Sequence, residues 1–173
     1  MPRQRTIASP VSLQGRGLFH GRHARLTFYP APADHGVVFI RRDLKGAEVP
    51  ALVRHVVKRA RRTALKRGEA VVETCEHVLS AVSGARLDNL RIELDSLEVP
   101  AVDGSAKPFL DALEGAGAEE QAAARRVLRV REPVVVRQDD AMIAAVPSEE
   151  PELQVLYELD YSGRSRAIGR QLR

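Results

Sequence analysis

The sequence predicts an α+β protein with two parts, and three observations support this. Period-two strand patterns dominate the first part of the chain, two helical segments follow within residues 74–115, and only strand patterns come after residue 127. The chain has 173 residues, of which 44% are hydrophobic and 29% charged. This length and composition suffice for one ordinary hydrophobic core and part of another.

Alternating apolar residues identify the strands. The clearest pattern covers residues 90–95, where Leu90, Ile92 and Leu94 are expected to face a core. Other strands are predicted at residues 24–29, 37–40, 51–57, 63–73, 134–136, 141–146 and 153–159, with turns at residues 67–68 and 139–140. The last three strands come without a helix to cover them, so residues 127–173 are expected to be the unfinished start of a second domain.

Two helices are predicted between the strands. The first is expected to have Thr74 as its N-cap, to cover residues 75–83 and to stop at Gly84. The second is expected to start at Ser105, to tolerate a proline in its first turn and to end at Gly115. The Ala- and Glu-rich segment 116–126 then reads as a connection, which gives a first domain over residues 1–124.

Composition and charge exclude several classes of protein. The longest apolar run, residues 141–146, is too short to span a membrane, and no secretory signal is visible, so a soluble cytoplasmic protein is expected. One cysteine, Cys75, excludes a disulfide within the chain and a multi-cysteine zinc cluster. The formal net charge is +4, and residues 58–67 hold six cations and no acid. We interpret this run as a solvated face rather than a nucleic-acid site, since few aromatic residues accompany it.

The Thr74-Cys75-Glu76-His77 segment at the start of the first helix is the sharpest candidate for chemistry. The positive end of the helix dipole favours an ionised Glu76 and a neutral His77. A neutral imidazole can bind a metal ion, and a neighbouring carboxylate can take a proton from water. The alternative is that Glu76 only complements the helix dipole and that His77 is an ordinary polar residue of the first turn. Spacing alone leaves both interpretations open.

The other candidates have structural explanations. A catalytic zinc normally takes three protein ligands, and none of the five histidines is followed by an acid at the fourth position. His20 and His23 are expected to be exposed turn residues, and Cys75 a small packing residue. The Asp103-Gly104-Ser105 triplet is expected to form a tight turn before the second helix.

The order of motifs resembles the N-terminal half of the UDP-3-O-acyl-N-acetylglucosamine deacetylases, which are zinc enzymes of lipid A biosynthesis. The segments that carry the resemblance are Gly15-Arg16-Gly17-Leu18, Thr74-Cys75-Glu76-His77 with Ala81, Asp88-Asn89, Glu98-Val99-Pro100 and Asp103-Gly104-Ser105 with Pro108-Phe109. The resemblance implies a two-layer sandwich in which two helices cover one face of a mainly antiparallel sheet, repeated in a second domain.

The resemblance also implies roles for two residues. His77 would be one of three zinc (Zn2+) ligands, and Glu76 would be the general base that activates the attacking water. The substrate would be a UDP-sugar lipid precursor, whose N-acetyl group is hydrolysed. The complete enzyme would be a cytoplasmic monomer with peripheral contact to the membrane surface and no nucleic-acid partner, and the other ligands would lie beyond Arg173.

One motif departs from the family pattern. The family has a histidine directly after the Gly-Leu of its first hairpin, whereas Phe19 follows Leu18 here and His20 comes one residue later. A shift of one residue on a strand reverses the face of a side chain, so no role is transferred to His20. Two alternatives to an enzyme portion are a naturally short, non-catalytic relative that serves as a binding or scaffolding module, and an RNA-binding module that uses residues 58–67.

Overall fold

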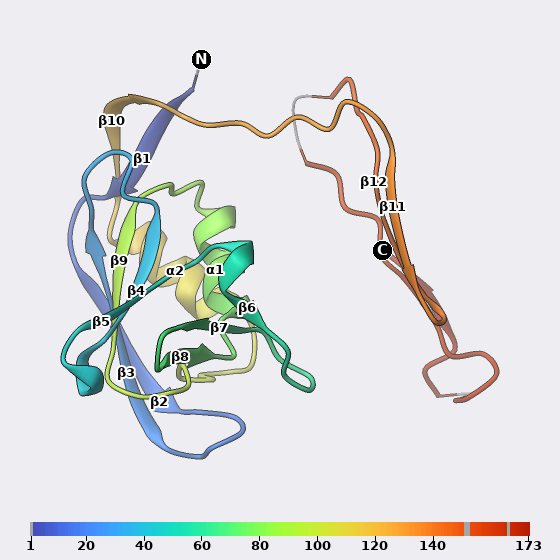
Figure 1. The fold of residues 1–173 in the computed structure, drawn as a ribbon, viewed down its shortest axis with the longest axis horizontal. Helices are drawn as coiled ribbons and strands as arrows, with labels where there is room; N and C mark the ends of the chain where they lie inside the picture. Colours follow the sequence, from blue (N-terminus) through green and yellow to red (C-terminus); the bar gives the residue numbers. More distant parts are fainter. Residues whose placement is uncertain (1, 151–152, 166) are drawn as a thin grey trace. The chain divides into compact units, whose positions relative to one another are not determined.

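The structure is a computed structural model that describes residues 2–150, 153–165 and 167–173 (Figure 1). The contacts within the chain form two compact units, Met1–Arg126 and Val127–Arg173. We describe each unit by itself. None of the helices in these described ranges is long and apolar enough to cross a membrane.

A five-stranded sheet forms the frame of the first unit. Its strands, in spatial order, are β2 (Val11–Arg16), β3 (His23–Pro30), β9 (Leu90–Leu94), β4 (Val37–Arg41) and β5 (Ala47–Pro50). Neighbouring strands are antiparallel except for the parallel pair β4–β9. The α+β class and the antiparallel character predicted from the sequence are confirmed.

Two helices form the second layer, α1 (Glu76–Gly84) and α2 (Lys107–Gly115) (Figure 1). Leu90, Ile92 and Leu94 of β9 are fully buried, as their alternation predicted. They share one core with Val78 of α1 and Phe109 of α2. Removing this apolar surface from water is the main force that holds the helices on the sheet.

Two smaller sheets complete the first unit. One contains β6 (Val56–Val57), β7 (Ala64–Arg67) and β8 (Ala70–Glu73), with β7 and β8 joined by a turn at residues 68–69, one residue later than predicted. The other pairs β1 (Arg3–Ile7) with β10 (Ala118–Ala124). The 3-10 turns η1 (Arg42–Leu44) and η2 (Val53–His55) lie in the loops after β4 and β5.

Two predicted segments of the first unit differ from the structure. Residues 51–57 are not one strand, because the N–H groups of Leu52 and His55 bond backward to Pro50 and Leu52 and so form turns before the short β6. Segment 116–126 is not a plain connection, because β10 pairs along β1 with Thr6 opposite Glu119. Hydrogen bonds to a distant strand, rather than local composition, decide the structure of this segment.

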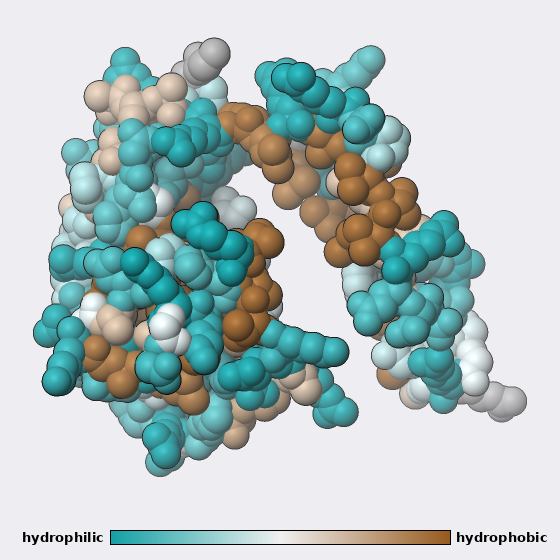
Figure 2. Space-filling view, in the orientation of Figure 1, coloured by the Kyte–Doolittle hydropathy of each residue, from teal (hydrophilic) through white to brown (hydrophobic). Residues whose placement is uncertain are grey.

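The second unit contains two hairpins. The first joins β11 (Val134–Gln138) and β12 (Ala141–Ala145), and the second joins β13 (Glu158–Asp160) and β14 (Arg170–Leu172). The first hairpin and its turn agree with the prediction. The predicted strand at residues 153–159 is confirmed only at its end, where Tyr157 exchanges backbone hydrogen bonds with Arg173 and β13 begins at Glu158. Residues 153–156 form no strand, and the side chains of Leu153 and Val155 stay exposed. Brown, hydrophobic surface covers much of this unit in Figure 2.

Candidate functional site

The two candidate catalytic residues lie at the junction of β8 and α1. Glu76 is the first residue of α1 and His77 the second, and both are half-buried. The N-cap position belongs to Cys75, without a side-chain hydrogen bond, so the prediction of a Thr74 cap was wrong. Thr74 takes a left-handed backbone conformation, φ +60°, and its hydroxyl bonds to Glu98 instead of to the helix.

The Glu76 carboxylate is held at one of its two oxygens. Its Oε2 accepts a hydrogen bond from the backbone N–H of Thr63 at 3.0 Å, just before β7 begins. The described part of the chain places no hydrogen-bond donor on Oε1 and no partner on the His77 ring. One fixed carboxylate oxygen, one available oxygen and an available imidazole are suited to proton transfer and to metal binding.

A buried carboxylate that the sequence analysis assigned no role, Glu98, lies under this junction. Glu98 is 1% exposed, and its backbone forms an isolated parallel β-bridge with the backbone of Glu73. It accepts hydrogen bonds from the backbone N–H groups of Phe19 and His20, each at 2.9 Å, and from the Thr74 hydroxyl at 2.9 Å. Burial alone would raise the pKa of Glu98, but these three donors outweigh it and lower that pKa. The carboxylate is therefore an anion that ties the β2–β3 hairpin tip to the start of α1.

Glu73, at the end of β8, is the second buried carboxylate. Its oxygens accept hydrogen bonds from Arg59 Nε at 2.8 Å, Arg62 Nε at 2.9 Å and His20 Nε2 at 3.0 Å. Burial acts to raise the pKa of Glu73, whereas the bonds to His20, Arg59 and Arg62 lower it to about 2. The only sequence signal for this role was an acidic residue at the end of an apolar strand.

This cluster revises the prediction for the basic run and gives His20 a contact that was not predicted. The loop between β6 and β7 projects from its sheet, and hydrophilic surface covers it (Figures 1 and 2). Arg62 is only 16% exposed at its side chain, because it binds Glu73 and lies 4.3 Å over the Phe19 ring. His20 lies in a turn and is exposed, as predicted, and its ring also binds the buried Glu73 carboxylate. The run is thus partly an internal ion cluster and not a fully solvated face.

Two other predictions about this region agree with the structure. Cys75 is fully buried, and burial, followed by the negative charge of Glu76, raises the pKa of its thiol to about 12, as befits a packing residue. Asp103 forms the predicted turn, since its Oδ1 accepts hydrogen bonds from both the N–H and the hydroxyl of Ser105 at 2.9 Å. Helix α2 starts at Lys107, two residues later than predicted.

The described residues do not complete a metal centre. No group of three His, Cys, Asp or Glu side chains in these ranges could hold a metal ion. His77 fits as a single ligand, because its ring lies half-buried beside the fixed Glu76 carboxylate. A catalytic zinc needs two more protein ligands, which this set does not supply.

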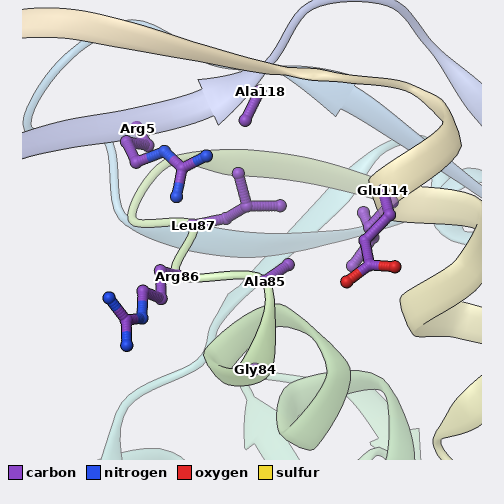
Figure 3. A pocket seen from close by; sticks show the side chains of 8 residues that line it. Arg5, Gly84, Ala85, Arg86, Leu87, Glu114 and Ala118 are labelled. Carbon is purple, nitrogen blue, oxygen red and sulfur yellow. The ribbon is translucent and has the colours of Figure 1, made fainter. Parts of the chain in front are cut away.

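A cavity of about 330 Å³ lies away from this junction. Figure 3 shows it at the other end of α1, where Gly84 and Leu87 line it together with Arg5 and Glu114. Side chains of opposite charge point toward it, and neither Glu76 nor His77 contributes to its wall. We therefore do not assign this cavity to the candidate site.

Comparisons with known proteins agree with one another. A family model described as LpxC, UDP-3-O-acyl N-acetylglycosamine deacetylase, matches residues 4–173. Three similar proteins are named UDP-3-O-acyl-N-acetylglucosamine deacetylase. The protein of Anaeromyxobacter sp. (strain Fw109-5) is 46% identical over 84% of this chain and 48% of its own length, and that of Myxococcus xanthus (strain DK1622) is 43% identical over 84% of this chain and 46% of its own length. The protein of Cellvibrio japonicus (strain Ueda107) is 40% identical over 93% of this chain and 54% of its own length. The chain spans about half the length of the curated relatives it matches.

Proposed function

The chain belongs to the UDP-3-O-acyl N-acetylglycosamine deacetylase family, and from this premise we propose that it supplies part of the active site of a zinc-dependent deacetylase. The reaction is hydrolysis of the N-acetyl group of a UDP-3-O-acyl-N-acetylglucosamine, a step of lipid A biosynthesis. One observation carries the proposal: Glu76 and His77 share the first turn of α1, with Glu76 anchored by the Thr63 N–H at 3.0 Å.

We assign Glu76 the role of general base. Its free oxygen, Oε1, takes a proton from the attacking water, while the Thr63 N–H keeps the carboxylate in place. Attack on the amide carbon breaks the C–N bond and gives acetate and a free amine, and the proton held by Glu76 can pass to that amine.

We assign His77 the role of one zinc ligand. The neutral imidazole is the form that binds a metal ion. When bound, zinc supplies Lewis-acid chemistry that polarises the amide carbonyl. We propose that the other ligands lie beyond Arg173, since the described residues offer no group of three His, Cys, Asp or Glu side chains that could hold a metal ion.

We further propose that residues 1–124 form the first α+β domain of the enzyme and that residues 127–173 begin a second, similar domain. The coverage of about half of each relative supports this arrangement. The complete enzyme is then a cytoplasmic monomer that meets its lipid-bearing substrate at the membrane surface. The chain is, on this proposal, the N-terminal portion of a longer protein.

A chimera tests the catalytic assignment. We would join residues 1–173 to the remaining part of the 46% identical relative and measure release of the free amine from UDP-3-O-acyl-N-acetylglucosamine. We expect Glu76→Gln to lower kcat by roughly 100-fold or more, because a general base contributes that much. His77→Ala should abolish turnover and reduce the zinc content. Glu48→Gln, at an exposed carboxylate of β5, is the control and should change neither.

A mass measurement tests the proposal that the chain is the N-terminal portion of a longer protein. We expect the native gene product to be clearly heavier than 19.0 kDa by immunoblot and intact mass. Residues 1–173 alone should bind zinc weakly and show no turnover. Appreciable deacetylase activity of the isolated chain would contradict this proposal. A native product of 19.0 kDa without activity would instead favour the non-catalytic binding module.

A further inference from the structure

We propose that Glu98 is a positioning residue, which sets the backbone turn from which α1 presents Glu76 and His77. The inference rests on the proposed function, because it assigns Glu98 a part in the reaction that these two residues carry out. The carboxylate is 1% exposed, so it acts through the residues that it binds rather than on a substrate.

Three hydrogen bonds place Glu98 between two separate segments of the chain. Oε1 accepts the N–H of Phe19 and the hydroxyl of Thr74, and Oε2 accepts the N–H of His20. Phe19 and His20 form the tip of the β2–β3 hairpin, whereas Thr74 is the last residue before the Cys75 N-cap of α1. A movement of the carboxylate would therefore move the hairpin tip and the helix start together.

The backbone of Thr74 needs such support. A β-branched residue rarely adopts a positive φ, and Thr74 has φ +60°. Its N–H is bound to the carbonyl oxygen of Thr63 at 2.9 Å, and its hydroxyl is bound to Glu98. Residues held in such conformations persist where surrounding contacts over-determine them. This turn sets the direction in which α1 leaves β8, and Glu76 follows two residues later.

Close contact from the hairpin side fixes the carboxylate as well. A Cβ atom added to Gly17 would lie 2.3 Å from Oε2 of Glu98 and 2.8 Å from its Cδ. Gly17 does not have a left-handed φ, so the carboxylate is what excludes a larger residue there. Gly17→Ala should therefore displace the Glu98 carboxylate while leaving Thr74, Glu76 and His77 unsubstituted.

The test uses kinetics of the complete gene product together with crystal structures of the variants. We expect Glu98→Gln to lower kcat by about 100-fold and to leave KM within threefold. A catalytic group displaced by about 1 Å produces a loss of this size. Gly17→Ala should lower kcat in the same direction. Glu48→Gln, an exposed carboxylate on β5, is the matched control and should retain kcat.

A second variant separates positioning from folding. Glycine adopts φ +60° without support, so Thr74→Gly added to Glu98→Gln should restore kcat at least tenfold. The crystal structure of Glu98→Gln should show a changed φ at residue 74 and a displaced His77. An unchanged turn with kcat within twofold of the parent would overturn the inference, and so would a loss of kcat that Thr74→Gly fails to restore.

The same experiment distinguishes failure of the proposed function from failure of the positioning role of Glu98. If the parent protein shows no deacetylation, the proposed function fails. The φ of residue 74 in Glu98→Gln still decides whether the carboxylate controls the turn. If the parent is active and the turn does not depend on Glu98, only the positioning inference fails.

Discussion

Arg62 binds the buried carboxylate of Glu73, with its Nε 2.9 Å from Oε2. Glu73 is 3% exposed and also binds Arg59, so two cations of the basic run converge on one anion inside the first unit. Removing one partner of such a cluster leaves a buried charge uncompensated, which is strongly destabilising. The β6–β7 loop is therefore held against the end of β8 by an ion cluster.

This cluster predicts a loss of stability in acid. The pKa of Glu73 is about 2 in the folded protein, against an ordinary value of 4.5. Folding then favours the deprotonated form of Glu73. The contribution of this carboxylate to the free energy of unfolding is therefore fully present above about pH 4.5 and disappears as the pH falls toward 2. It amounts to at most about 3 kcal/mol of the free energy of unfolding. Urea unfolding of the 173-residue chain between pH 2.5 and pH 7 measures this dependence.

Glu73→Gln provides the comparison for that curve. The variant should be less stable than the parent at pH 7, and the difference should shrink as the pH falls below 4.5. Glu48→Gln, whose carboxylate is exposed and 3.6 Å from Arg67, should follow the parent within about 0.5 kcal/mol. Parallel pH curves for the parent and Glu73→Gln would contradict the role assigned to the cluster.

The sequence predicted those parts of the fold that local patterns determine. The alternation of Leu90, Ile92 and Leu94 identified a strand and its buried face, and Gly115 identified the end of α2. The pairing of β10 with β1 could not be predicted, because a segment rich in Ala and Glu has no strand pattern of its own. Its position depends on hydrogen bonds between residues more than 100 positions apart.

In the candidate site, too, the sequence predicted what residue type indicates and missed what distant contacts determine. Glu76 and His77 could be selected from residue type and family resemblance, and their roles stay predictions. Glu98 and Glu73 could not be assigned partners from the sequence. The donors to Glu98 include backbone N–H groups of Phe19 and His20, and a backbone N–H leaves no signature in the residue type.

Cys75 should be unreactive in the folded protein. Its side chain is fully buried, and burial raises the pKa of the thiol to about 12, so very little thiolate exists at pH 8. We expect no alkylation by iodoacetamide at pH 8 over the period in which a free thiol reacts completely. In urea the same reagent should add one adduct, detected by intact mass. Rapid labelling without denaturant would show that the start of α1 opens readily.

Asn89 should be a stability determinant of the first unit. It is 1% exposed, its Nδ2 donates to the Oε1 atoms of Gln4 and Gln121, each at 2.7 Å, and its Oδ1 accepts the N–H of Gly36 at 2.8 Å. Asn89→Ala leaves buried polar groups without partners, so we expect a loss of about 2–4 kcal/mol in the free energy of unfolding.

An exposed hydrogen bond supplies the control for Asn89→Ala. Ser12 and Thr27 are joined through their hydroxyls at 2.8 Å on the surface of the five-stranded sheet. Ser12→Ala should change the free energy of unfolding by less than about 0.5 kcal/mol, because water replaces the lost partner. Equal effects of the two alanine substitutions would mean that burial does not strengthen the Asn89 network.

Val102 should be a site where glycine stabilises the protein. It is a β-branched residue with φ +53°, 47% exposed, in the loop before α2. A strained backbone of this kind costs roughly 1–3 kcal/mol, and Val102→Gly relieves it while adding freedom to the unfolded chain. We expect a net gain of about 1 kcal/mol in the free energy of unfolding, measured in urea.

Val53→Gly is the control for Val102→Gly. Val53 is an 89% exposed residue of η2 without a positive φ, so glycine there adds the same freedom to the unfolded chain and relieves no strain. It should lower stability by about 0.5–1 kcal/mol, so the two substitutions should have opposite signs. A loss of similar size at both positions would show that the loop at Val102 is not strained.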